Sequence, residues 1–193
     1  MQPRGVSTGF PWLEPEASRP KHHPMQTSVR RASRADATAI NRIYNHYVRT
    51  STCTWHLTEE TDEGRRKWID SRGGLHPVLV AESGGEVVGW GSLSVYNSRQ
   101  GWDGTVEDSV FIDHRHQGRG LGKLILGRLI EEATRLGHRV VVARISGEQT
   151  ASIRLHASLG FTEAGRLRGV GRKFGQTLDC IYMQKDLGQP LAP

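Results

Sequence analysis

The most informative stretch of the chain runs Val110-Phe-Ile-Asp-His-Arg-His-Gln-Gly-Arg-Gly-Leu-Gly-Lys123. A strand expected at residues 105–112 passes through a glycine-rich turn into an amphipathic helix expected at residues 120–136. A helix start exposes unpaired N–H groups and the positive end of its dipole, and glycines let a phosphate approach the backbone closely. The stretch therefore predicts an anion site, to which Arg119 and Lys123 add positive charge.

The spacing of these glycines decides which of three nucleotide-binding motifs the turn matches. The P-loop pattern fails, because its first glycine is replaced by Gln117 and its hydroxyl residue by Leu124. The dinucleotide fingerprint begun at Gly118 fails as well, because it requires glycine where Lys123 stands. The pattern that remains is Q-x-x-G-x-G, which runs from Gln117 to Gly122.

Outward from this turn, the periodicity of apolar residues predicts alternating elements. We expect further helices at residues 36–49, 61–71 and 150–159, and further strands at 27–31, 77–82, 86–94, 140–145 and 179–185. Ser83-Gly84-Gly85 predicts a hairpin turn, and the apolar strand 140–145 suits the centre of a sheet. The order predicts a mixed α/β domain, with antiparallel strands first and a βαβα unit later.

Composition limits the class of protein. A chain of 193 residues suits one domain, and five of its eight prolines lie in the first 24 residues. We therefore expect a disordered extension at 1–25, with Met25 as an alternative start, one folding unit at 26–187 and a tail at 188–193. The adjacent His22 and His23 are expected to be exposed, so no metal site is predicted.

Charge and cysteine usage exclude other classes. The net charge of +6 comes from basic residues interspersed with acidic ones, without zinc ligands or a clustered basic helix, so we expect no nucleic-acid partner. No apolar run approaches the ~18 residues that cross a bilayer, so we expect no membrane partner. Cys53 and Cys180 form no CxxC pair, which favours packed thiols in a reducing cytoplasm.

The glycine turn resembles the pyrophosphate-binding signature of the GCN5-related N-acetyltransferase (GNAT) superfamily. Further motifs resemble one branch of it, the phosphinothricin and methionine sulfoximine acetyltransferases, over about residues 27–187. These motifs are Ile43-Tyr-Asn-His-Tyr47, Ser51-Thr52, Val78-Leu-Val-Ala-Glu82, Thr105-Val-Glu-Asp-Ser-Val110, Ala151-Ser-Ile-Arg-Leu-His156, Leu159-Gly-Phe161 and Gly171-Arg-Lys-Phe-Gly175.

The resemblance implies a fold and a cofactor. The fold is a central, mostly antiparallel sheet with splayed strands flanked by helices, with a bulge in strand 105–112. The cofactor is acetyl-CoA, with its pyrophosphate at the turn and its pantetheine arm along the strand; Gln149 stands where the branch usually has Asn. The implied cofactor-binding residues are Val110, Phe111, Ile112, Gln117, Gly118, Arg119, Gly120, Leu121, Gly122, Lys123 and Gln149.

Acetyl transfer to an amine needs a group that accepts the amine proton and one that protonates the departing thiolate. We expect Glu107 to be the base, because it lies on the strand that leads to the turn; the alternative is that it pairs with a nearby Arg. Asp108 should point to the opposite face. His156 stands where many superfamily members have Tyr, and either donates the proton, directly or through water, or is a packed histidine.

The acceptor is expected to be a small amino-acid-like amine, whose carboxylate favours an Arg. Arg99 is the best placed by sequence, although the branch often carries its Arg where Asn97 stands. Lys173 and Phe174 are expected to line the pocket from this subunit's tail or from a partner's. The resemblance also implies a homodimer and direct transfer in a ternary complex. The alternatives are another amine (a protein N-terminus, polyamine or aminoglycoside) and a non-catalytic acyl-CoA sensor.

Overall fold

The computed structural model describes residues 27–188. The expected extension at 1–25, with Met25 and the two histidines, and all but Gly188 of the expected tail lie outside the described residues.

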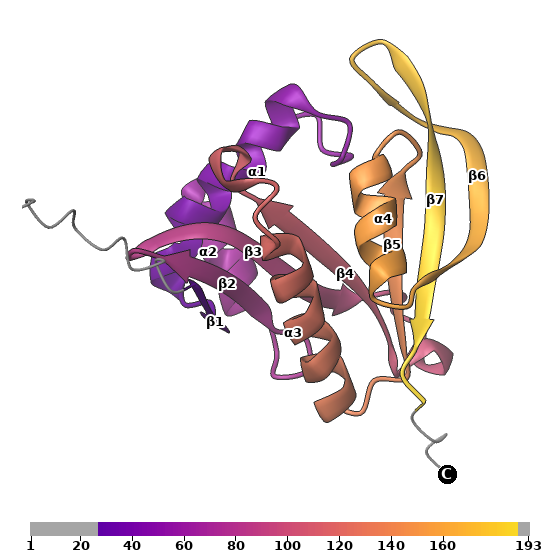
Figure 1. The fold of residues 1–193 in the computed structure, drawn as a ribbon, viewed down its shortest axis with the longest axis horizontal. Helices are drawn as coiled ribbons and strands as arrows, with labels where there is room; N and C mark the ends of the chain where they lie inside the picture. Colours follow the sequence, from indigo (N-terminus) through magenta and orange to yellow (C-terminus); the bar gives the residue numbers. More distant parts are fainter. Residues whose placement is uncertain (1–26, 189–193) are drawn as a thin grey trace, which may run out of the picture.

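One seven-stranded sheet forms the centre of the fold, in the order β1-β2-β3-β4-β5-β7-β6 (Figure 1). All neighbouring strands are antiparallel except β4 and β5, which are parallel. The turn between β2 and β3 has Gly84 and Gly85 at φ values of 59° and 80°, the left-handed region that a two-residue hairpin loop requires. The strands are β1 (Thr27–Arg31), β2 (Val78–Ser83), β3 (Glu86–Val95), β4 (Thr105–Ile112), β5 (Val140–Ser146), β6 (Thr162–Lys173) and β7 (Gln176–Asp186).

The sheet is split between β4 and β5. These strands pair only from Thr105 opposite Val140 to Glu107 opposite Val142. Beyond that point β4 stays paired with β3 while β5 stays paired with β7, so the two halves diverge, as Figure 1 shows. The divergence leaves an opening in the middle of the sheet.

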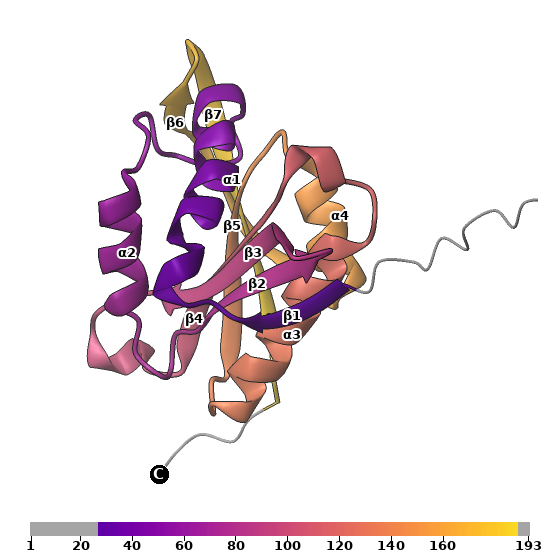
Figure 2. The ribbon, with the colours of Figure 1, turned by 90° about the vertical axis from the view of Figure 1, so that its left-hand side faces the viewer.

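Helices cover both faces of the sheet. Figure 2 shows α1 (Ala37–Thr50) and α2 (Asp62–Asp70) on one face, and α3 (Leu121–Arg135) and α4 (Thr150–Ser158) on the other. Short 3₁₀ turns lie at Arg34–Asp36 (η1), Gln100–Trp102 (η2) and His114–His116 (η3). Ile125, Leu126 and Leu129 of α3 are fully buried against the sheet. Gly89 and Gly91 of β3 permit this approach, because a Cβ on either would lie within 3.0 Å of the Ile125 side chain.

The mixed α/β fold expected from the sequence is confirmed, and every element that the periodicity predicted is present. The sequence analysis did not predict β6. This edge strand contains three glycines and many basic residues, and both its faces are exposed, so it lacks the apolar alternation that marks a strand. The expected parting of strand 105–112 from a neighbour is present, but the expected bulge is not, because β4 pairs with β3 in unbroken register.

Candidate active site

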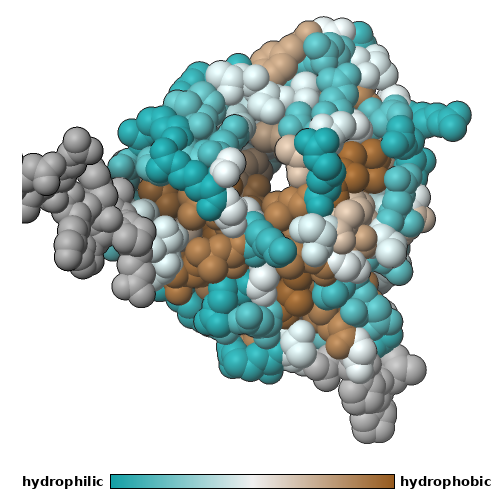
Figure 3. Space-filling view, in the orientation of Figure 1, coloured by the Kyte–Doolittle hydropathy of each residue, from teal (hydrophilic) through white to brown (hydrophobic). Residues whose placement is uncertain are grey.

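A cavity of about 860 Å³ occupies the opening between β4 and β5. Its lining comes from α1, the segment after it, α2, β3, β4, the glycine turn, β5 and α4. In Figure 3 the molecular surface is open near the middle of the face shown, and hydrophobic residues form part of the rim of the opening beside hydrophilic ones. The cavity therefore reaches both faces of the sheet at the point where the backbone ladder is interrupted.

The glycine turn contributes unpaired backbone donors to the cavity. Gly118 and Gly120 have φ values of 74° and 78°, and Leu124 is the first residue of the α3 turn whose N–H reaches a carbonyl four residues back, that of Gly120. The N–H groups of the first helical turn are consequently free to bind an anion. Gly122 also brings α3 close to α4, since a Cβ there would lie 3.0 Å from Leu155.

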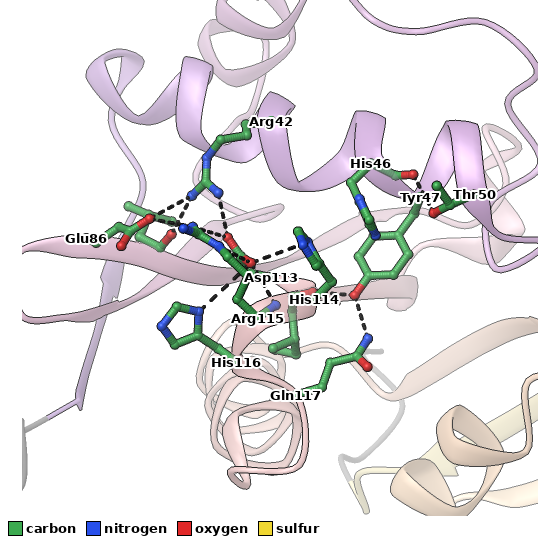
Figure 4. Close-up of polar contacts among 12 residues, drawn as sticks. Arg42, His46, Tyr47, Thr50, Glu86, Asp113, His114, Arg115, His116 and Gln117 are labelled. Atoms are coloured by element: carbon green, nitrogen blue, oxygen red, sulfur yellow. Dashed lines mark hydrogen bonds and ion pairs between the residues drawn. The ribbon is translucent and has the colours of Figure 1, made fainter.

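A side chain of α1 and a backbone carbonyl of β4 hold this turn in place. Gln117 Nε2 donates to the hydroxyl of Tyr47 at 2.8 Å, and that hydroxyl donates to the carbonyl of Ile112 (Figure 4). The end of β4, the turn and α1 are thus joined at one point beside the cavity.

Asp113, directly after β4, is the centre of a charged cluster (Figure 4). Its buried carboxylate accepts from Arg42 Nη1 at 2.6 Å, from Arg115 Nη2 at 2.8 Å, and from the Arg115 N–H at 3.0 Å. Arg115 also reaches Glu86 of β3 at 2.7 Å. The Arg115 hydrogen bonds, with help from Arg42, hold the pKa of the Asp113 carboxyl well below its ordinary value of 3.8. The cluster fixes where the chain leaves β4 and enters the turn.

Glu107 of β4 lines the cavity on the face covered by α1 and α2 and forms an ion pair with Arg144 of β5, 2.7 Å between Oε2 and Nη2. Burial raises the pKa of Glu107 above its ordinary value of 4.5 by disfavouring the charged form, and Arg144 offsets only part of this effect. Glu107 therefore pairs with an Arg, as the alternative interpretation of this residue expected. Glu107 is also a carboxylate in a cavity, and its raised pKa means that it binds a proton more readily.

Asp108 points to the opposite face, as strand alternation predicts, and meets His156 of α4. His156 Nε2 lies 3.1 Å from Asp108 Oδ2, and Nδ1 lies 2.8 Å from the Ser152 carbonyl oxygen. Burial alone would lower the pKa of His156, but the hydrogen bond and charge of Asp108 outweigh it, so the pKa is raised above 6.5. Both ring nitrogens face acceptors, an arrangement that suits the protonated imidazole.

Unsatisfied polar atoms gather around the cavity. Within residues 27–188, every buried side-chain polar atom without a hydrogen-bond partner, except Asn41 Oδ1, belongs to a residue of the lining. These atoms are Arg65 Nε, Arg72 Nε, Trp90 Nε1, Asp108 Oδ1, His116 Nδ1 and Ser146 Oγ. Buried polar groups are normally paired, so this concentration indicates a site built for a polar ligand.

The cavity brings together most of the residues expected to bind the cofactor. Gln149 is in the lining and donates from Nε2 to Thr52 Oγ1 at 2.9 Å, whereas Arg119 and Lys123 are exposed and lie outside the lining. The other members of that set in the lining are Val110, Phe111, Ile112, Gln117, Gly118, Gly120, Leu121 and Gly122.

The residues expected to bind the acceptor lie elsewhere. Arg99 is exposed, and neither it nor Asn97 lines the cavity; the only contact between them joins the Arg99 N–H to Asn97 Oδ1. Lys173 is buried against the carbonyls of Thr54 and Tyr47, and Phe174 is exposed, so neither lines this subunit's cavity. Their role in binding the acceptor therefore stays a prediction, because this subunit's cavity does not include them.

Two arginines that the sequence analysis missed occupy the cavity instead. Arg65 of α2 and Arg72, just after it, both line it, with Trp68 between them. The sequence feature that could have identified them is their spacing, because residues 65, 68 and 72 share one face of a helix. Arginines on the face of a helix that packs against the protein are unusual.

Among residues 27–188 no group of three or more His, Cys, Asp or Glu side chains is arranged to hold a metal ion. No helix in the same range is long and apolar enough to cross a membrane.

Comparison with known proteins identifies close relatives. The sequence model described as "Acetyltransferase (GNAT) family" matches residues 40–161. The chain is 44% identical to an L-methionine sulfoximine/L-methionine sulfone acetyltransferase of Salmonella typhimurium, over 86% of this chain and 98% of that one. It is 36% identical to a phosphinothricin N-acetyltransferase of Streptomyces viridochromogenes, over 90% and 94%.

Among solved structures, an acetyltransferase from Salmonella typhimurium determined with its cofactor acetyl-CoA superposes with a TM-score of 0.84. It is 43% identical, and the match covers 87% of this chain and 98% of that one.

Asp113→Asn should lower the free energy of unfolding at pH 7 by about 2 kcal/mol, because charged hydrogen bonds to a buried carboxylate are lost. The Asp113 pKa is depressed in the fold, so its contribution is present above its unfolded value of 3.8 and is lost as the pH falls below that value. Urea unfolding at several pH values should show the wild-type advantage shrinking toward acid pH. Glu131→Gln, which removes a surface ion pair with Arg128, is the control and should change little; an equal loss in both variants would refute this account of the cluster.

Proposed function

This chain belongs to the acetyltransferase (GNAT) family, and from that premise we propose that it transfers the acetyl group of acetyl-CoA to the amino group of a small amino-acid-like molecule. The relatives named above act on methionine sulfoximine, methionine sulfone or phosphinothricin, as their names state. The observation that carries the proposal is the cavity itself, which runs from the free amides of the glycine turn to the Glu107 carboxylate.

The residues of the turn and of β4 fit coenzyme A. The free N–H groups that open α3 suit a diphosphate, with Arg119 and Lys123 adding charge from the exposed side. Residues 108–112 of β4 have no backbone partner on the side of β5, so their edge can pair with an amide-containing arm as an added strand would. Bound there, acetyl-CoA supplies a thioester whose carbonyl an amine can attack.

Glu107 is proposed as the general base. An amine attacks only in its neutral form, so a proton must leave it, and a carboxylate with a raised pKa accepts that proton more readily. Arg144 keeps enough of Glu107 ionised for this task and holds its Oε2 oriented at 2.7 Å.

The His156–Asp108 pair is proposed as the source of the proton for the departing thiolate. Both residues line the cavity, and the pair holds a proton between Nε2 and Oδ2 while Ser152 orients the ring. Cys53 also lines the cavity, but burial raises its pKa, which favours the thiol over a nucleophilic thiolate. This supports direct transfer within a ternary complex.

The charges of the cavity favour an acceptor that carries an anionic group. Two of its carboxylates, Glu107 and Asp108, have basic partners, and the charge of the third, Glu60, acts on Arg65, so the cavity offers little to attract a polyamine or an aminoglycoside. A sensor that only binds acyl-CoA would have no need of a buried carboxylate with an increased proton affinity beside the cavity.

A homodimer, a cytoplasmic location and a catalytic domain at 26–187 complete the proposal. Strand β6 is an edge of the sheet and exposes Leu167 and Val170, with the exposed Phe174 in the turn after it, a surface that a second copy would cover. The free thiols of Cys53 and Cys180 agree with a reducing compartment.

A thiol-release assay tests the activity. Acetyl-CoA with methionine sulfone, methionine sulfoximine or phosphinothricin should release CoA, and spermidine should release little, because Glu107 and Asp108 are paired and Arg65 and Arg72 add two cations to the lining. No release with any amine would contradict the proposed function, and preferred release with spermidine would contradict the acceptor class.

Glu107→Gln should lower kcat by about a hundredfold or more, the effect of losing a general base. In the wild type, kcat/KM should fall as the pH drops through the raised pKa of Glu107, because the protonated carboxyl accepts no proton. Arg144→Met should move this acid limb to higher pH, since Arg144 stabilises the carboxylate. The control is Arg128→Met on the outer face of α3; an acid limb that stays in place in the Arg144 variant would remove Glu107 from the role of base.

Sedimentation velocity should show a dimer of the full chain. Leu167→Asp combined with Val170→Asp should yield monomers, because the charges would be buried in the interface, whereas Leu75→Asp, at an exposed site away from β6, should leave the dimer intact. A wild-type monomer, or a dimer that survives the double substitution, would contradict the use of this edge.

A further inference from the structure

Two arginines, Arg65 buried and Arg72 partly buried, form one wall of the cavity on the same face as Glu107. Arg65 is 5% exposed, and its guanidinium lies 4.8 Å from the ring centres of both Tyr44 and Trp68 and 5.6 Å from that of Trp90. Arg72 lies on the other side of Trp68, 4.2 Å from its ring centre. The aromatic rings fix the planes of both guanidinium groups.

Neither arginine has a carboxylate partner within residues 27–188. The Arg65 side chain makes no hydrogen bond or ion pair to a described residue, and the Arg72 side chain donates only to the Leu93 carbonyl and the Ser94 hydroxyl, at 3.4 and 3.2 Å. The charge of Glu60 acts on Arg65, but no ion pair joins the two side chains. Glu60 Oε1 instead accepts a hydrogen bond from the Thr61 N–H. Buried guanidinium groups are ordinarily paired, so these two stand out.

The unsatisfied atoms on this wall are all donors. Arg65 Nε, Arg72 Nε and the indole Nε1 of Trp90 are buried without an acceptor, and all three residues line the cavity. Three N–H donors on two cations and an indole match the lone pairs of a carboxylate, and Arg is suited to bind one with two parallel hydrogen bonds. A neutral ligand would leave both charges uncompensated.

The wall adjoins the proposed base. Ser94 of β3, which accepts from Arg72, lies directly opposite Glu107 on β4. Directly opposed residues of an antiparallel pair place their side chains on one face as neighbours. In an α-amino acid the amino nitrogen and the carboxylate are bonded to the same carbon, so a site for the one must adjoin a site for the other.

We propose that Arg65 and Arg72, assisted by the indole N–H of Trp90, form the subsite that binds the carboxylate of the acceptor and turns its amino group toward Glu107. This assignment rests on the proposed function and replaces Arg99 as the carboxylate ligand. The two arginines are specificity residues, because they touch the acceptor away from the bond that forms.

A purely structural role for the two arginines predicts a different effect of their replacement on stability. If the cation–aromatic stack existed to hold α2 on the sheet, its loss would destabilise the protein. An uncompensated buried cation, by contrast, is a cost to the empty protein, and burial does lower the pKa of both guanidinium groups. Replacing such a cation with an apolar side chain of similar length should leave stability unchanged or raise it.

The experiment compares two acceptors, methionine sulfone and its carboxamide, which differ only in the carboxylate charge. Thiol release is measured for the wild type, Arg65→Met, Arg72→Met and the control Arg128→Met, with thermal unfolding of each. The wild type and the control should strongly prefer the acid. Arg65→Met and Arg72→Met should each raise KM for the acid by about tenfold or more, the effect expected from the loss of one charged hydrogen bond. Both variants should lose the preference for the acid over the carboxamide. Their KM for acetyl-CoA and their midpoint of thermal unfolding should stay as in the wild type.

Arg65→Lys separates charge from geometry. It keeps the positive charge but not the fork, so it should restore part of the preference for the acid. If the wild type acts on the acid but Arg65→Met and Arg72→Met retain its preference, the subsite is overturned while the proposed function stands. The same follows if Arg99→Met alone abolishes the preference. If the wild type releases no thiol with any amine, the result contradicts the proposed function, and the assignment of the subsite falls with it.

Discussion

The site depends on one interruption of backbone pairing, the parting of β4 from β5 after Glu107. A sheet that stayed paired would leave no space between its strands, about 4.8 Å apart. Here β4 remains bonded to β3 and β5 to β7, so neither strand loses its support when they separate. The cavity, the exposed edge of β4 and access from both faces all follow from this geometry.

Strand alternation then sorts two adjacent carboxylates into different environments. Glu107 faces α1 and α2 and pairs with Arg144, whereas Asp108 faces α4 and pairs with His156. The pKa is raised for the partly buried Glu107 carboxyl on one side and for the His156 imidazole on the other. The proposed proton acceptor and the proposed proton donor thus lie on opposite sides of one opening, an arrangement that suits amine acetylation.

Buried charge is handled in two ways around the cavity. Asp113 is fully compensated by Arg42 and Arg115, and this cluster holds the glycine turn against the end of β4 and α1 (Figure 4). The Arg65 and Arg72 side chains contact aromatic faces and neutral acceptors but form no ion pair with a described residue. The first arrangement gives rigidity to the turn that we propose binds coenzyme A, and the second would give an anionic acceptor a favourable binding free energy.

The sequence by itself determined the mixed α/β fold, the strand–turn–helix unit at residues 105–136 and the opposite orientation of Glu107 and Asp108, because these follow from local periodicity and from glycine spacing. It failed for β6, whose exposed faces carry no apolar alternation. It also gave no sign that Arg65 and Arg72 line the cavity beside Glu107, since they are far from Glu107 along the chain. Only the tertiary structure decided that α2 lies over β3 beside the base, that His156 reaches Asp108, and that β4 and β5 separate, because these depend on packing between distant segments.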